Sequence, residues 1–170
     1  MLAGLAILEP ACVFSKKTNA SISKPQLPVE LENDLENADE FTLFSITPQL
    51  DYEQKSTNTF EGHAILGGLK ITNLTMKTSL IKALNDGLSE NKNRRNVPGK
   101  IYKLPACFNP RHGIRAKKGD ETVEFLICFQ CAQIKVNSSK GKYWSLITSK
   151  EPAAVFNDVL VENGVPLPEN

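Results

Sequence analysis

The stretch TVEFLICFQCAQIKV, residues 122–136, decides the fold that we expect for this chain. It is rich in β-branched and aromatic residues, and the turn-forming sequence KKGDE precedes it. Its middle, FLICF (residues 125–129), is apolar at every position, which is typical of a strand covered on both faces. We therefore expect residues 122–136 to form one long central strand.

Shorter runs of alternating or β-branched residues predict further strands on either side of this stretch. These runs are residues 41–46, 60–71, 101–106, 112–116 and 142–148. Gly67 and Gly68 lie inside the second run and indicate a bulge or bend there, because glycine leaves no side chain to pack.

Two helices are expected between and after the strands. The first follows Thr72 or Asn73, since either side-chain oxygen can accept a free backbone amide. Its apolar stripe is Met76, Leu80, Ile81, Leu84 and Leu88, and it should end near residue 90. The second helix begins near Pro152 and stops at Gly164. The resulting order, ββ-α-βββ-α, predicts an α+β domain with an antiparallel or mixed sheet and two helices packed on it.

Size and composition point to a single folded domain, which we expect to span residues 40–168. The chain has 170 residues, of which 41% are hydrophobic, and this is enough for an ordinary core. It carries 20 basic and 19 acidic residues, and this near-neutral balance gives no electrostatic case for nucleic-acid binding, which normally needs a basic face. With a single tryptophan, Trp144, a stacking platform for single strands is also not expected.

The N-terminal region predicts export. Residues 1–12, MLAGLAILEPAC, combine a short apolar run with a cysteine after a small residue, as in a signal segment with a lipoprotein site at Cys12. The run is too short for a transmembrane helix, which needs about 20 residues. Residues 13–39 are polar and are expected to be a flexible linker. We expect a cell-envelope or periplasmic protein, either lipid-anchored at Cys12 or secreted; the alternative is a cytoplasmic protein.

Four residues that bind soft metals lie within CFNPRHGIRAKKGDETVEFLICFQC, residues 107–131. Cys107, His112, Cys128 and Cys131 supply the three thiolates and one imidazole of a tetrahedral zinc site. Neighbours in an extended strand alternate faces, so Cys128 and Cys131, three residues apart, should point to opposite sides. This geometry counts against zinc. It also counts against a redox C-x-x-C site, which needs a helix N-terminus to lower the cysteine pKa.

A disulfide is the other interpretation of the cysteines. A hairpin around Gly119 puts His112 opposite Ile127 and brings Cys107 near Cys131. A Cys107–Cys131 bridge would close a loop of 25 residues and stabilise the fold by about 3 kcal/mol in the chain-entropy model. Cys128 would then be a buried thiol.

Arg111 and Arg115 alternate with His112 and Ile114, which predicts that both arginines share one face of a strand. Two guanidinium groups on one face can hold a carboxylate or a phosphate, so we regard them as a candidate anion contact. Two solvated surface charges are the simpler interpretation. His112 is expected to be a hydrogen-bonded structural histidine.

The same segment resembles an uncharacterised group of bacterial proteins that are often predicted to be exported. Their shared core is C-F-x-P-R-H-G-I-R followed by I-C-F-x-C, which this chain carries as CFNPRHGIR and ICFQC. A Pro-x-x-x-Phe helix and a Gly-Val-Pro-Leu ending correspond to residues 152–156 and 164–167. The resemblance covers residues 60–167 and implies one coherent domain without implying an activity.

These observations predict a non-catalytic cell-envelope lipoprotein or secreted domain, with a structural cysteine cluster and no cofactor. No paired carboxylates in a convincing setting, nucleophile elbow or zincin motif favours an enzyme. The alternative is a metal- or thiol-dependent enzyme or sensor, with zinc as the cofactor, centred on Cys107, His112, Cys128 and Cys131.

Overall fold

The structure is a computed structural model that describes residues 26–51, 56–95 and 107–169. The expected signal segment, Cys12 and the expected strand at residues 101–106 lie outside the described residues.

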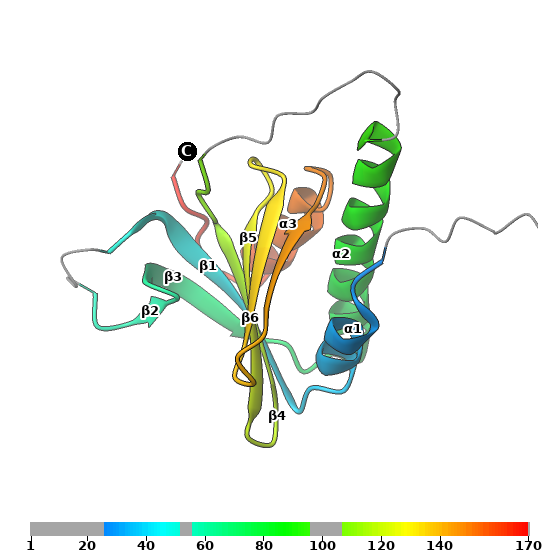
Figure 1. Cartoon of the computed structure of the whole chain (residues 1–170). Coiled ribbons are helices and arrows are strands. Elements are labelled where there is room, and N and C mark those ends of the chain that lie inside the picture. Colours follow the sequence, from blue (N-terminus) through cyan, green and yellow to red (C-terminus); the bar gives the residue numbers. More distant parts are fainter. Residues whose placement is uncertain (1–25, 52–55, 96–106, 170) are drawn as a thin grey trace, which may run out of the picture.

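In the described residues, seven strands form one sheet of order β2-β3-β1-β4-β5-β6-β7 (Figure 1). The strands are β1 (Glu40–Leu50), β2 (Thr59–Phe60), β3 (His63–Lys70), β4 (His112–Lys118), β5 (Glu121–Cys128), β6 (Gln133–Ser138) and β7 (Tyr143–Ile147). Every neighbouring pair is antiparallel. The expected α+β class is therefore confirmed, with a purely antiparallel sheet.

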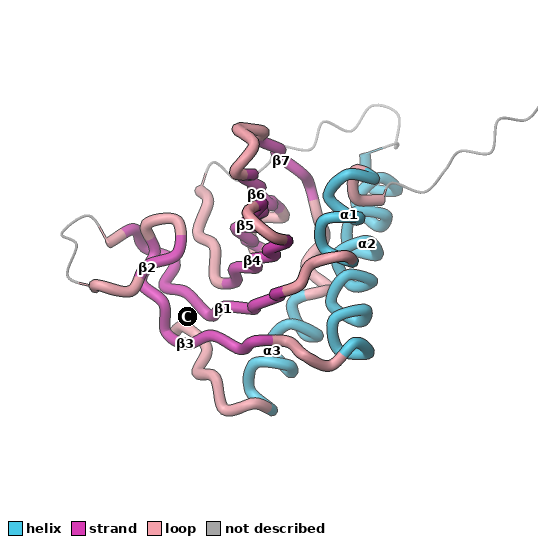
Figure 2. The backbone as a smooth tube through the Cα atoms, turned by 90° about the horizontal axis from the view of Figure 1, so that it is seen from below, coloured by secondary structure: helices cyan, strands magenta, loops and turns pink. Residues whose placement is uncertain are grey.

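Three helices in the described part of the chain pack on one face of this sheet (Figure 2). They are α1 (Val29–Glu36), α2 (Leu74–Arg95) and α3 (Ala153–Glu162). The two expected helices correspond to α2 and α3, although α2 continues to Arg95 and does not end near residue 90. Asn73 caps α2, since its Oδ1 accepts the backbone amide of Met76 at 3.1 Å.

Helix α1 corrects the expectation that residues 13–39 are a flexible linker throughout. Leu31 and Leu35 of α1 are fully buried in the main core, and Leu27 just before the helix is 3% exposed. These leucines recur every four residues, so they lie on one face of the helix and bury it against the sheet and α2.

The main core lies between the helices and one face of the sheet. Alternate strand residues point into it, beginning with Phe41 and Leu43 of β1 and continuing with Ile114 of β4 and Phe125 of β5. From α2 and α3 come Leu80, Leu84, Phe156 and Leu160. None of the described helices combines the length and the hydropathy that crossing a membrane would take.

A smaller apolar cluster forms on the opposite face because the β2–β3 hairpin bends over it. Phe60 of β2 packs there with Phe44, Ile46 and Leu126. Its ring lies so close to β4 that a Cβ on Gly113 would meet it at 2.7 Å, so this position requires glycine. The sheet is thus bent enough to bring its edge hairpin over β4.

The long central strand expected at residues 122–136 is wrong. The chain turns at residues 129–132 and returns as β6, which pairs with β5. Ala132 has a φ of 55° and provides the left-handed residue of this turn. The expected strand at residues 60–71 is likewise divided, because Glu61 and Gly62 form a two-residue turn between β2 and β3.

The bulge or bend expected at Gly67 and Gly68 is present one residue earlier, as a bulge at Leu66. Ser45 pairs with Gly67, whereas the next residue, Ile46, pairs with Ile65, so Leu66 is the extra residue on β3. The predicted hairpin register is also confirmed, because His112 pairs with Ile127 in the β4–β5 ladder.

Candidate functional site

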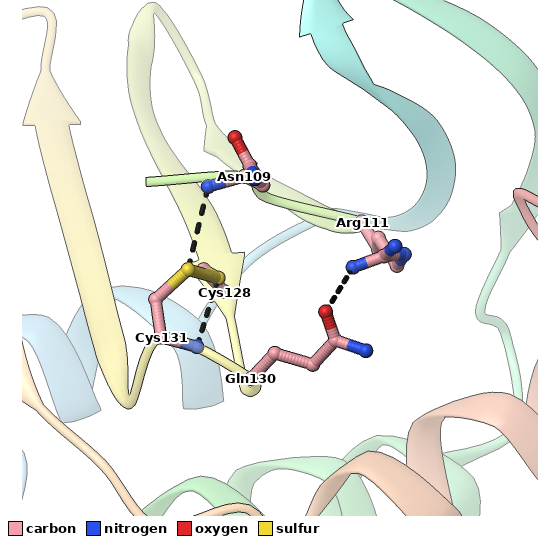
Figure 3. The surroundings of a disulfide bond; sticks show 5 residues. All are labelled: Asn109, Arg111, Cys128, Gln130 and Cys131. Carbon is pink, nitrogen blue, oxygen red and sulfur yellow. Dashed lines mark hydrogen bonds between the residues drawn. A yellow bond between two sulfur atoms is a disulfide. The ribbon is translucent and has the colours of Figure 1, made fainter. Parts of the chain in front are cut away.

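A disulfide joins Cys128, the last residue of β5, to Cys131 in the turn that follows (Figure 3). The Cα atoms are 5.2 Å apart, within the ordinary range for a disulfide. Both residues are buried, at 1% and 3% exposed. The backbone amide of Cys131 donates to Sγ of Cys128 at 3.1 Å, and that of Asn109 donates to Sγ of Cys131 at 3.4 Å.

The predicted Cys107–Cys131 bridge is therefore wrong. Residues three apart in a strand point to opposite faces, but across a tight turn they approach each other, and the turn at residues 129–132 was not anticipated. Cys107 is a free, exposed cysteine.

The four candidate zinc ligands do not form one cluster in this structure. Two of them are joined as the disulfide, and Cys107 lies at the surface. His112 uses its Nε2 atom to bind Asn157. Within residues 26–51, 56–95 and 107–169, no group of three His, Cys, Asp or Glu side chains is arranged to hold a metal.

His112 is a buried, neutral histidine, as expected for a structural residue. It is 4% exposed, its Nε2 lies 2.8 Å from Oδ1 of Asn157 on α3, and its ring packs against Phe129 and Phe156. Burial lowers the pKa of His112 to about 4; the charge of Arg111 acts in the same direction, and the Asn157 hydrogen bond opposes both. Its Nδ1 is buried without a partner.

A small pocket adjoins this histidine and the disulfide turn. Its volume is about 120 Å³. The residues that line it are Asn109, Arg111, His112, Phe129, Gln130, Ala153 and Asn157. Arg111 also lines a larger hollow of about 540 Å³, which contains Leu66 and Pro166. Arg111 therefore borders both hollows, and Glu169 also lines the larger one.

Arg111 is held in place by a neutral partner. Its Nη1 donates to Oε1 of Gln130 at 2.5 Å, as Figure 3 shows. Its Nε is buried and has no hydrogen-bond partner. Because Gln130 belongs to the turn that the disulfide closes, the disulfide helps to position this arginine.

Arg115 lies in a different environment from Arg111, on the face covered by the β2–β3 hairpin. Its Nε donates to Oε1 of Glu124 at 2.6 Å, and its guanidinium lies 5.4 Å and 5.3 Å from the ring centroids of Phe44 and Phe60. The structure therefore does not bring the two arginines, predicted as one anion contact, into a common site. Arg115 is already paired with a carboxylate.

A second carboxyl group, Glu61, approaches the same ion pair. Burial raises the pKa of Glu61, and so do its hydrogen bond to Glu124 and the charge of that neighbour; Asn137 and Arg115 oppose this rise. Glu61 has a φ of 49°, which is uncommon for a residue with a long side chain. These residues line a hollow of about 560 Å³.

The sequence alone does not identify most of the hydrogen-bond partners of Arg111, His112 and Arg115. The Glu124 partner follows from the hairpin register, since Arg115 and Glu124 are paired across β4 and β5. Asn157 and Gln130 had no such signal, because their roles depend on the docking of α3 and on the turn after Cys128.

Comparisons of this chain with protein-family models, with curated proteins and with solved structures found no match. The chemistry of these residues is therefore the basis for a functional proposal.

Proposed function

We propose that this chain is an exported, non-catalytic binding domain of the cell envelope that the Cys128–Cys131 disulfide holds together. The buried disulfide is the observation that carries this proposal. Disulfides persist in oxidising compartments and are rare in the reducing cytosol. The proposal also agrees with the group of exported bacterial proteins that residues 107–131 resemble.

The disulfide has a structural role in this proposal. It closes a loop of four residues, 128–131, which corresponds to about 2 kcal/mol in the chain-entropy model. Its Cys131 sulfur also accepts the amide of Asn109, and its turn contains Gln130; both residues line the small pocket. In the same proposal Cys12 carries a lipid, and the residues between Cys12 and α1 connect the domain to the membrane.

The test is the intact mass of the protein recovered from its own host, with free thiols alkylated at lysis. We expect the loss of two hydrogens for one disulfide, one alkylated thiol at Cys107 and a lipid on Cys12. A Cys128→Ser variant is the control and should lose the disulfide. A reduced, unlipidated protein would contradict the proposal, and a zinc adduct that denaturation removes would support the metal alternative instead.

A second candidate is a thiol sensor, and the position of Cys107 favours it. Cys107 is exposed and lies two residues before Asn109, whose amide contacts Sγ of Cys131. The Cys107 thiolate would attack Sγ of Cys131, the bond between Cys131 and Cys128 would break, and Cys128 would leave as a thiolate. The Cys131 amide already donates to that leaving sulfur. The exchange consumes no oxidant, since one disulfide replaces another and the proton lost by Cys107 passes to Cys128.

Peptide mapping separates the two candidates. For a structural disulfide we expect only the Cys128–Cys131 bond, before and after incubation with catalytic amounts of a small thiol. A Cys107–Cys131 bond that appears on incubation, and is absent from a Cys107→Ser variant, would favour the sensor.

A further inference from the structure

Arg111 lines the small pocket, and no carboxylate within the described residues neutralises its charge. Of its seven lining residues only Arg111 carries a full charge, because His112 is neutral at pH 7. Among the described ion pairs, none joins Arg111 to a carboxylate within 4 Å. The pocket is therefore electropositive.

Arg111 has hydrogen-bonding capacity that the described residues do not use. Gln130 occupies Nη1, while Nε is buried without a partner. The edge formed by Nε and Nη2 presents two parallel N–H groups, and this spacing matches the two oxygens of a carboxylate. Such a fork can also bind a phosphate, but the apolar side chains of Phe129 and Ala153 in the lining favour a ligand with a short carbon chain.

The first turn of α3 adds a second source of positive potential. Ala153, the first residue of this ten-residue helix, and Asn157, one turn later, both line the pocket. The N-cap residue Pro152 makes no side-chain capping bond, and the first turn has no acidic residue. The amide of Ala153 already donates to the carbonyl of Lys150, so the contribution of the helix is its partial positive charge, which favours anions.

We propose that this pocket binds the carboxylate group of a small organic acid, held between Arg111 and the first turn of α3. The inference rests on the proposed function, because it names the site and the ligand class of that binding domain. Phe129 and Ala153 provide an apolar wall for a short carbon chain. The side-chain amides of Asn109, Gln130 and Asn157 provide further polar contacts. The carboxylate belongs either to a free acid or to the C-terminus of a peptide.

The test uses the oxidised, ¹⁵N-labelled full chain, titrated with acetate and butyrate at constant ionic strength and followed by NMR. We expect saturable shifts of the Arg111 Nε–H signal and of the side-chain amides of Asn109, Gln130 and Asn157. We expect a dissociation constant of about 1 mM for ligands of this size. Acetamide has the same shape without the charge and should produce no saturable shift.

Variants separate the pocket from general charge effects. Arg111→Gln should weaken acetate binding at least about 10-fold, and Arg111→Lys should also weaken it, because lysine keeps the charge but loses the fork. The matched control is Lys117→Gln, which removes one exposed positive charge from β4, the strand that follows Arg111, away from the pocket. Its acetate affinity should remain that of the wild type. Thermal unfolding of each variant shows whether it is folded.

The source of the carboxylate is identified by adding an acetylated dipeptide acid and its amide. Tighter binding of the peptide acid than of butyrate, with no binding of the amide, identifies a peptide C-terminus; the reverse order identifies a free acid. No saturable shift, equal binding by phosphate, or equal loss in Arg111→Gln and Lys117→Gln would overturn the proposal. An intact mass taken first confirms the disulfide, so a negative titration counts against the pocket and not against the proposed function.

Discussion

Arg111 lies just before β4 and Arg115 lies within it, yet the surroundings of the two arginines differ in almost every respect. Arg115 has a carboxylate partner, Glu124, and two phenylalanine rings against its guanidinium. Arg111 has a glutamine partner and a buried Nε without any. Arg115 is therefore a component of the fold, whereas Arg111 retains hydrogen-bonding capacity that the described residues do not use.

The difference follows from where each residue lies along the ladder. Arg115 is in the middle of β4, where a cross-strand neighbour is always opposite, and here that neighbour is Glu124. Arg111 lies before the first paired residue of β4, beside a turn and the start of α3. Binding residues are more often found at such ends of elements than inside a ladder.

The largest expected effect concerns His112, which packs beside Arg111. Its pKa is about 4 in the folded protein and about 6.5 in the unfolded chain, so the unfolded chain takes up the proton first as the pH falls. Its contribution is complete above pH 6.5 and decreases toward pH 4, where about 3 kcal/mol of the free energy of unfolding is lost. Urea unfolding from pH 7 to pH 4 measures this loss.

A His112→Gln variant should flatten this pH dependence, and His63→Gln is the matched control. The pKa of His63 is also lowered, mainly by burial, so this variant removes the contribution of His63 to the pH dependence and leaves that of His112 in place. An unchanged slope in His112→Gln would show that His112 is accessible to protons in the folded state.

The disulfide is the next test of the Arg111 end. Replacing both Cys128 and Cys131 by serine should lower the free energy of unfolding by about 2 kcal/mol, because the unfolded chain is no longer closed at this turn. The signals of Asn109 and Gln130 should broaden in NMR spectra, while those of Glu124 should not. Equal broadening at both arginine sites would mean that the disulfide does not act locally.

The arginines themselves are compared directly by removing each charge. Arg115→Gln should destabilise the fold by about 1 to 2 kcal/mol, since it removes a partly buried ion pair and two cation–π contacts. Arg111→Gln should cost less, about 0.5 kcal/mol, because the loss of one hydrogen bond is partly offset by the removal of a buried Nε that has no partner. Chemical denaturation of both variants checks the order, and the reverse order would invalidate the comparison.

Glu61 gives the smallest expected effect. Its raised pKa means that the ionised carboxyl is less favourable in the folded chain than in the unfolded one, so stability decreases as the pH rises through the carboxyl range. Glu61→Gln should therefore raise the free energy of unfolding at pH 7, by a few tenths of a kcal/mol after allowance for solvent screening. Glu40→Gln, another residue of the same hollow, is the control.

The periodic parts of the chain were predictable and the turns were not. The apolar stripe of α2, the cap at Asn73 and the hairpin around Gly119 follow from local rules. The turn at residues 129–132 contains no glycine or proline, and its left-handed residue is Ala132, so the sequence 122–136 has the pattern of one strand. Because this turn is not predicted, the sequence pairs Cys131 with Cys107, whereas the structure pairs it with Cys128.

The candidate site was predictable only in its residue types. Arg111 and His112 were singled out, but Asn157 and Gln130 reach them from α3 and from the missed turn. Helix α1 is not predicted for a related reason, since its leucines stabilise the helix only when they are buried against α2 and the sheet. Such contacts depend on the packing of elements that are far apart in the sequence, and no local sequence pattern indicates that packing.

The burial of both sulfurs has a consequence for how the protein moves. A reductant cannot reach Cys128 or Cys131 while they are 1% and 3% exposed, so the turn must open before the bond is broken. The lifetime of the disulfide in a reducing buffer is then governed by how often residues 128–131 open. The rate of reduction of this bond therefore reports how often the sheet opens locally at the end where Arg111 lies.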